Sequence, residues 1–219
     1  MNELGKVMPP YDRTIDAIII TNPDADHIAG FLEILKRYKV RQVFEPGTFN
    51  NSKTYENLEV EIQRQNIPRV LVKQGMRLDL GGSAVIDILF PDRDVSLLSS
   101  NDGSVIAKLS YGETSVMLTG DATGDTEKIV LEDFSHEVLE SDVLKVAHHG
   151  SRTSSIEDFI KAVSPTYALI SNGKDNRYSH PHPETLDTLG LFGAEIIRTD
   201  VVGTVIMKSD GLKETFLYK

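Results

Sequence analysis

Residues 21–27 read Thr-Asn-Pro-Asp-Ala-Asp-His and directly follow an apolar run at residues 17–20. The run predicts a short buried strand, and the apolar positions within 28–35 have the spacing of an amphipathic helix. The polar stretch therefore lies between the carboxyl end of a strand and the start of a helix, where open α/β sheets bind their ligands. Aspartates at a helix start can simply cap the helix, but two aspartates beside His27 also make a candidate metal-binding motif.

Apolar runs alternate with helical periodicity along the chain, which predicts an α/β class. Further strands are predicted at 42–44, 143–147, 168–171, 195–198, 204–208 and 215–218, and further helices at 55–62, 123–132, 156–163 and 184–192. Strand candidates at 69–73, 76–80, 84–90, 104–110 and 115–119 predict a meander of mostly antiparallel strands. Ser52 is a predicted helix cap, Ser154 and Glu157 are a predicted capping box, and Pro183 is a predicted first-turn residue. Because nothing has the composition of a linker, we expect one domain over residues 1–219.

The composition excludes several classes of protein. The 219 residues include no cysteine, which rules out disulfides, thiolate zinc sites and cysteine nucleophiles. Their formal net charge of −10 argues against broad electrostatic adhesion to nucleic acid or to anionic membranes. No apolar run approaches the roughly 18 residues of a membrane span, and the polar segment 1–16 does not have the pattern of a signal peptide.

Three more polar clusters follow predicted strands, and most of the histidines lie in such clusters. Thr119-Gly120-Asp121 is the least specific, because Gly-Asp commonly forms a turn. His148 and His149 form an adjacent pair in front of Gly150, where a glycine allows close approach of another segment; a structural loop pair is the alternative. Residues 176–183 read Asn-Arg-Tyr-Ser-His-Pro-His-Pro, and the prolines restrict the directions of both imidazoles.

Together the four clusters resemble the motifs of the metallo-β-lactamase fold in their chain order. More narrowly, they are similar to the β-lactamase-like domain of the ComEC/Rec2 competence proteins. The strings His-His-Gly-Ser at 148–151 and His-Pro-His-Pro-Glu at 180–184 are the most specific, and 101–104, 142–147 and 198–203 also fit. The resemblance implies an αββα sandwich of two mixed sheets between helical layers, with the clusters at one edge.

The resemblance also implies a centre for one or two divalent ions, Zn²⁺ or Mn²⁺. Its implied metal ligands are Asp24, Asp26, His27, Asp121, His180 and His182. In this arrangement Asp121 bridges toward a second ion held by Asp24 with weaker help from Asn22, and His182 substitutes if His180 points away. Carboxylates favour Mn²⁺ or Mg²⁺ whereas imidazoles suit Zn²⁺, which leaves the metal open.

A metal-activated water attacking a phosphoester is the chemistry that the resemblance implies. The residues implied for catalysis are His148, His149 and Asp26, and those implied for substrate binding are Ser151, Asn176 and Arg177. The residues leave open which of the two adjacent histidines contacts the phosphate or protonates the leaving group. Arg152 and Lys174 are further candidates for orienting an anionic substrate, with solvated loop charge as the alternative.

Two departures from the family pattern stand out. The usual first ligand motif is His-x-His-x-Asp-His, and here Asn22 stands at its first histidine and Asp24 at its second. This weakens the first metal position and predicts no turnover of β-lactams such as nitrocefin. The family's opening strands also have no counterpart before residue 17, which predicts an exposed sheet edge that could pair with a partner.

We therefore expect a metal-dependent hydrolase of the phosphodiesterase or nuclease type, acting on a phosphoester such as single-stranded DNA. The alternative is a non-catalytic domain of the same fold that acts in binding or assembly linked to DNA uptake. A nucleic-acid-binding module without chemistry fits poorly with the net charge of −10. With no export signal the default location is the cytoplasm, whereas a domain of a ComEC-like channel lies outside the inner membrane.

Overall fold

The computed structural model describes residues 2–219, with side chains described from residue 4 onward, so Met1 lies outside the described part of the chain. The helices are α1 (Asn2–Val7), α2 (Ala25–Arg37), α3 (Lys53–Arg64), α4 (Gly124–Asp133), α5 (His136–Leu139), α6 (Glu157–Val163), α7 (Pro183–Leu191) and α8 (Thr199–Val202). A 3-10 turn, η1, spans Ala147–Gly150.

The strands are β1 (Thr14–Ile15), β2 (Ile18–Ile19), β3 (Lys39–Val40), β4 (Val43–Glu45), β5 (Arg69–Leu71), β6 (Arg77–Gly81), β7 (Ala84–Phe90), β8 (Ile106–Tyr111), β9 (Thr114–Leu118), β10 (Val143–Lys145), β11 (Tyr167–Ile170), β12 (Glu195–Arg198), β13 (Val205–Ser209) and β14 (Glu214–Tyr218). They form a seven-stranded sheet, a three-stranded sheet and the two-stranded pairs β1-β3 and β13-β14. The predicted α/β class is confirmed.

The seven-stranded sheet has the order β12-β11-β10-β9-β8-β7-β6. Strands β6 to β9 pair antiparallel, as the predicted meander requires, whereas β9 to β12 pair parallel. This sheet is mixed, but the smaller sheet, β2-β4-β5, is parallel throughout. The expectation of two mixed sheets is therefore wrong for the smaller one.

Strand β5 was expected in the meander and instead pairs parallel with β4, with Arg69 opposite Val43. The helix α3 between these strands makes a parallel crossover, which only a connection of this length allows. Strand β2 lies at the edge of the smaller sheet. A partner strand at that edge stays a prediction.

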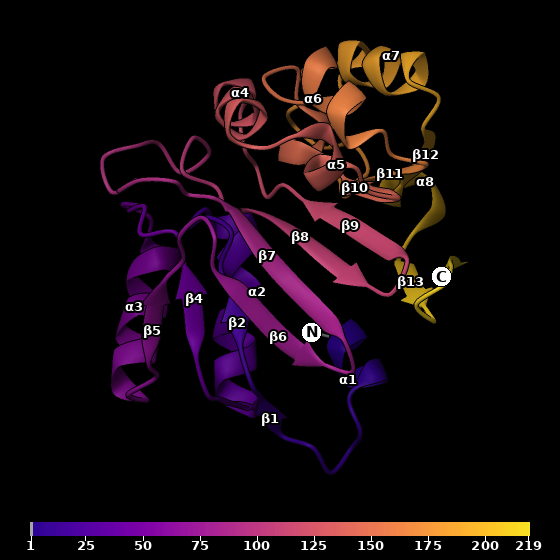
Figure 1. Ribbon diagram of the computed structural model, residues 1–219. Coiled ribbons are helices and arrows are strands. Elements are labelled where there is room, and N and C mark those ends of the chain that lie inside the picture. The colour runs from indigo at the N-terminus through magenta and orange to yellow at the C-terminus, as the bar shows by residue number, and fades with distance from the viewer. Residues whose placement is uncertain (1) are drawn as a thin grey trace.

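Three hydrophobic clusters separate four layers of structure. One lies between the smaller sheet and helices α2 and α3, with Ile28 and Leu58 nearly fully buried. A second lies between the two sheets and contains Ile88 and Val105, and the third lies between the large sheet and helices α4 to α7. Figure 1 shows α2 and α3 beside the smaller sheet and α4, α6 and α7 grouped over strands β9 to β12. This is the αββα sandwich that the resemblance implies.

Helix ends were predicted with mixed success. Ser52 caps α3 as predicted, because its Oγ accepts a hydrogen bond from the Tyr55 amide at 3.2 Å, and Pro183 stands at the start of α7 as predicted. The capping box at Ser154 and Glu157 is wrong, since Ile156 is the N-cap of α6. Instead, the buried Glu127 carboxylate of α4 accepts the amides of Ser155 at 2.8 Å and Ile156 at 2.9 Å.

The carboxyl ends of β2, β9, β10 and β11 meet at one edge of the sandwich. Strands β9, β10 and β11 are parallel neighbours, so the loops that follow them leave on the same side. The end of β2 is joined to this edge by the hydrogen bond from the Val105 amide to the Thr21 carbonyl, 2.9 Å long. Within residues 2–219, no helix combines the length and the apolarity that crossing a membrane requires.

Candidate metal centre

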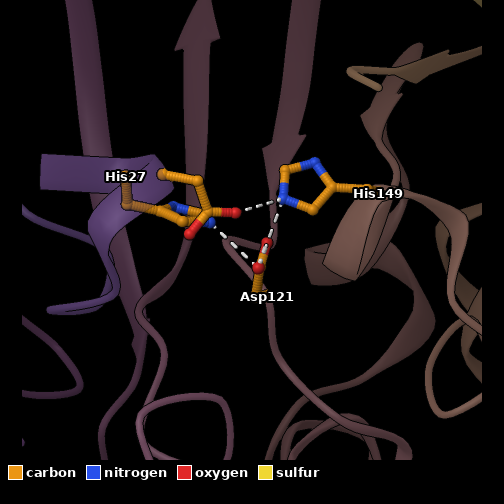
Figure 2. Close-up of side chains that lie close together, drawn as sticks. His27, Asp121 and His149 are labelled. Carbon is orange, nitrogen blue, oxygen red and sulfur yellow. Dashed lines mark hydrogen bonds and ion pairs between the residues drawn. The ribbon is translucent and has the colours of Figure 1, made fainter. Parts of the chain in front are cut away.

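Four side chains from three segments gather at this edge. Asp26 and His27 belong to the first turn of α2, Asp121 follows β9, and His149 lies in η1 after β10. One ligand atom from each lies within 4.8 Å of the others. Figure 2 shows His27 and His149 pointing toward Asp121 from opposite sides. We call these four residues the ligand cluster.

The distances inside the ligand cluster are short. The Nε2 atom of His27 lies 2.9 Å from Asp121 Oδ2. The Nε2 atom of His149 lies 3.2 Å from Asp26 Oδ2 and 3.5 Å from Asp121 Oδ2. Both imidazoles therefore direct Nε2 at the same carboxylate oxygen of Asp121, which is the geometry of side chains that converge on one point.

Each imidazole is oriented by a contact at its other ring nitrogen. The Nδ1–H of His149 donates to the Ser171 carbonyl across 2.5 Å, and Nδ1 of His27 lies 3.1 Å from Thr21 Oγ1. Because the carbonyl can only accept, the neutral ring of His149 has its proton on Nδ1 and its lone pair on Nε2. Second contacts of this kind orient metal-binding histidines in proteins.

The backbone of η1 is strained where it presents the histidines. His148 has φ 47° and ψ 44°, and His149 has φ 56° and ψ 22°, so both occupy the left-handed region that costs residues with a Cβ atom free energy. Gly150 follows with φ 83°, and a Cβ atom there would lie 2.5 Å from Pro181 Cβ. The glycine thus lets the loop after β11 approach η1 closely.

The charges around Asp121 keep it ionised although it is buried. Burial alone favours the neutral acid, but the nearby imidazoles of His149 and His27 and the charge of Lys145 outweigh it, so the pKa of Asp121 lies well below its usual range. The same contact with Asp121 raises the pKa of His149 against the effect of burial. An ionised carboxylate between two imidazoles is a ready ligand for a cation.

The ligand cluster fits a divalent ion. Among the described residues, the buried Nε2 atom of His27 has no hydrogen-bond partner of acceptable geometry, although Asp121 lies 2.9 Å away. A buried polar atom without a partner is costly unless a ligand satisfies it. Two carboxylates and two imidazoles form an N,O donor set that suits Zn²⁺ or Mn²⁺.

Asp24 and Asn22 lie next to the ligand cluster but outside it. The Oδ1 atom of Asp24 accepts a hydrogen bond from Asn50 Nδ2 at 2.7 Å. Asn22 is fully buried, and its Oδ1 accepts the Asp24 amide at 2.9 Å while its Nδ2 donates to Ser104 at 3.1 Å. The structure therefore gives Asn22 a role in holding the loop.

His180 and His182 also lie outside the ligand cluster, whose second imidazole is that of His149, so their role as ligands stays a prediction. The His180 ring faces the His149 ring at a centroid distance of 6.5 Å. Burial, with the neighbouring His148 and His182, lowers the pKa of His180 to about 4. The Nδ1 atom of His182 accepts the Arg152 amide at 3.1 Å, so this ring is engaged with the loop of residues 150–155.

The residues predicted to bind substrate are largely engaged with their own loops. Ser151 is buried, and its Oγ lies 3.0 Å from Thr153 Oγ1. The Asn176 side chain accepts the His180 amide and donates to the His180 carbonyl, so it shapes the loop after β11. The Arg177 guanidinium lies 4.6 Å from the centroid of the Tyr178 ring.

A cavity of about 430 Å³ opens beside the ligand cluster. It is lined by Asp26, His149, Ser171, Asn172, Gly173, Asn176, Tyr178 and His180. Tyr178 is 58% exposed, and its ring lies nearly parallel to the His180 ring, with 5.6 Å between centroids. A larger cavity of about 640 Å³ lies over β6 to β8 and contains no member of the ligand cluster.

Sequence reasoning gave no role to four residues around the site, Asn50, Ser104, Lys145 and Tyr178, although the last three lie in stretches that carry the resemblance. Lys145 donates to the Gly120 carbonyl at 2.5 Å and lies 3.5 Å from Asp121 Oδ1. A lysine inside an otherwise apolar strand was a usable signal, because lysine is rarely buried without a partner. Asn50 and Ser104 gave no such signal, since both residue types are common in loops.

Comparisons with known proteins show the family to which the chain belongs. A family model described as the metallo-β-lactamase superfamily matches residues 12–174. The chain belongs to the metallo-β-lactamase superfamily. It is 34% identical over 193 residues to ComE operon protein 3 of Bacillus subtilis. The aligned residues make up 88% of this chain and 24% of that protein.

A second curated relative of this metallo-β-lactamase domain is Recombination protein 2 of Haemophilus influenzae, 30% identical over 91% of this chain and 23% of that protein. The chain thus spans about a quarter of the length of these relatives. The resemblance to the ComEC/Rec2 competence proteins is confirmed.

Solved structures share the metallo-β-lactamase fold at low sequence identity. Igni18, a metallo hydrolase from Ignicoccus hospitalis, is 14% identical with a TM-score of 0.51 over 93% of this chain and 80% of that one. CmlA, a diiron β-hydroxylase from Streptomyces venezuelae, is 16% identical with a TM-score of 0.54 over 97% of this chain and 46% of that one. These similarities support the fold alone.

Proposed function

We propose that this domain is a metal-dependent phosphodiesterase of the nuclease type, with single-stranded DNA as its substrate. The observation that supports the proposal most directly is the ligand cluster, in which Asp26, His27, Asp121 and His149 converge within 4.8 Å. The adjoining cavity of about 430 Å³ has room for the groups that flank a phosphoester.

The ligand set determines which chemistry is available. A divalent ion held by two carboxylates and two imidazoles supplies Lewis-acid stabilisation of phosphoryl oxygens and lowers the pKa of a bound water. Because His149 belongs to the ligand cluster, His148 is the better candidate for contacting the phosphate or the leaving oxygen. Burial lowers the pKa of His148, so the neutral ring acts as a hydrogen-bond donor.

Cationic side chains near the site support an anionic substrate. Arg152 is exposed, and its guanidinium lies 3.3 Å from the equally exposed Glu184 carboxylate, an ion pair too weak to prevent exchange for a phosphate. Arg177 lies over Tyr178 beside the cavity. With a net charge of −10, binding depends on these local charges and on the ion.

The names of the relatives suggest where this activity is used. Three curated relatives are named ComE operon protein 3, Recombination protein 2 and, from Neisseria gonorrhoeae, Competence protein ComA, and we propose that the domain processes DNA during uptake, outside the inner membrane. A non-catalytic domain of the same fold is the second candidate. One observation favours this second candidate. Asn22 stands at a position where the family has a ligand, and its side-chain amide donates a hydrogen bond to Ser104 instead.

A hydrolysis assay decides between the candidates. Metal-depleted protein is supplied with Mn²⁺ or Zn²⁺ and incubated with bis-p-nitrophenyl phosphate and with single-stranded DNA. We expect hydrolysis of both, and its loss in Asp121→Ala but not in Asp125→Ala, which removes an exposed carboxylate of α4. Folded protein that hydrolyses neither substrate contradicts the proposal, and bound metal below one ion per chain then favours the non-catalytic role.

A further inference from the structure

The groups that a second metal ion would need already have protein partners. Asn22 is buried, and both ends of its amide are engaged, by the Asp24 amide and by Ser104. Asp24 Oδ1 accepts the side-chain amide of Asn50 at 2.7 Å. A second ion at this end of the cluster would meet an Asn22 amide engaged at both ends and an Asp24 carboxylate with one oxygen already hydrogen-bonded.

The shared carboxylate, Asp121, is divided between two environments. Its Oδ2 atom faces the imidazoles of His27 and His149 at 2.9 Å and 3.5 Å. Its Oδ1 atom faces the ammonium group of Lys145 at 3.5 Å. A bridging carboxylate offers one oxygen to each ion, and here the second direction is taken by a cation of the protein itself.

Lys145 is held in this position from strand β10. Its side chain is 23% exposed, and its Nζ donates to the Gly120 carbonyl at 2.5 Å, next to Asp121. The carbonyl and the Asp121 carboxylate together compensate for the loss of water around the ammonium group. These contacts therefore hold the Lys145 side chain against the loop that carries Asp121.

We infer that this domain holds a single divalent ion in the ligand cluster, and that Lys145 takes the place of the second ion as the positive partner of Asp121. The inference rests on the metal site of the proposed function and concerns its composition. Lys145 is a positioning residue in this arrangement. The ammonium group of Lys145 holds Asp121 with a single positive charge, whereas a second divalent ion at that place would carry two.

An electrostatic role and a purely structural role of Lys145 predict opposite effects of its removal on ion binding. A dication next to an ammonium group in a partly buried site is repelled by it more strongly than it would be in water. Removing the charge of Lys145 therefore strengthens ion binding, whereas loss of a purely structural contact weakens it. Asn22→His in addition restores an imidazole at the position where the family has one.

The test measures metal stoichiometry and affinity without reference to catalysis. Metal-depleted full chain is titrated with Mn²⁺ in a calorimeter, and bound Zn²⁺ is counted per chain after desalting by elemental analysis. We expect one ion per wild-type chain. We expect Lys145→Gln to bind Mn²⁺ at least about tenfold more tightly, and Asn22→His/Lys145→Gln to bind a second ion. Lys128→Gln, which removes an exposed lysine paired with Asp125, serves as the matched control and leaves affinity unchanged.

Two ions per wild-type chain overturn the inference, and this measurement needs no variant. Weaker binding in a Lys145→Gln variant whose circular dichroism and melting match those of the wild type also overturns it. If the wild type binds one ion and hydrolyses nothing, the proposed function fails while the inference stands. If the wild type hydrolyses DNA with two ions bound, the inference fails while the proposed function stands.

Discussion

The Nδ2 atom of Asn22 donates a hydrogen bond to the Oγ atom of Ser104 across 3.1 Å, although 82 positions separate the two residues in the chain. The backbone amide of Asp121 donates to the same Oγ at 3.2 Å. One buried hydroxyl thus joins the loop before α2 to the loop of Asp121. This contact holds together two of the three segments that form the ligand cluster.

Ser104→Ala is expected to destabilise the fold, because it leaves the Asn22 amide and the Asp121 amide buried without an acceptor. Each unsatisfied donor costs about 1–3 kcal/mol. The measurement is the free energy of unfolding in guanidinium chloride. Ser96→Ala at an exposed serine is the control, with a change within about 0.5 kcal/mol. Equal effects of the two substitutions contradict the prediction.

Thr21→Val is expected to weaken metal binding while preserving the fold. The Thr21 hydroxyl contacts Nδ1 of His27 at 3.1 Å, and loss of such an orienting contact typically costs about 10–100-fold in metal affinity. Titration of metal-depleted protein with Zn²⁺ measures the effect. Thr215→Val at an exposed position of β14 gives the baseline. An affinity equal to that baseline means that Thr21 does not orient the imidazole.

Tyr178→Ala is expected to raise KM for single-stranded DNA, because the exposed ring beside the cavity is placed to stack on a base. Stacking of this kind contributes about 1–3 kcal/mol per base. The comparison uses two oligonucleotides, one complete and one with abasic sites, and only the complete one should respond. Tyr11→Ala, at a tyrosine 88% exposed, should change neither. An equal rise in KM for the abasic oligonucleotide rules out stacking.

Glu127 is expected to make stability depend on pH. Burial raises its pKa from 4.5 to about 8, and the amides of Ile156 and Ser155 oppose this only in part. The folded state therefore binds more protons than the unfolded state between these values, so stability falls as pH rises from about 4.5 to about 8, by up to about 1.4 kcal/mol per pH unit. As pH rises over this range, the unfolding free energy of the wild type should fall relative to that of Glu127→Gln. A constant difference contradicts the prediction.

Elements with a strong local pattern were predictable. The apolar spacing within 28–35 indicated α2, and the serine before α3 indicated its cap. Such signals arise within one or two turns of chain, where periodicity and capping act. The cap of α6 was not predictable, because its acceptor, Glu127, lies 28 positions before Ser155. The same holds for β5, whose partner strand β4 was decided by the crossover through α3.

The candidate site was predictable as a set of clusters but not as a ligand set. The sequence by itself determined the α/β class, the position of each polar cluster after a strand, and the restriction of any metal site to aspartate and histidine in a chain without cysteine. One domain over residues 1–219 stays a prediction. These properties follow from periodicity, strand order and composition, which are written locally along the chain.

Only the tertiary structure decided which side chains converge. The left-handed backbone of His148 and His149 turns His149 toward Asp121, the buried hydrogen bonds of Asn22 keep it out of the ligand cluster, and Lys145 meets Asp121 across two neighbouring strands. Each outcome depends on distances of 3–4 Å between segments remote in sequence. Interactions that decay over such distances are set by packing, and packing is a property of the folded chain.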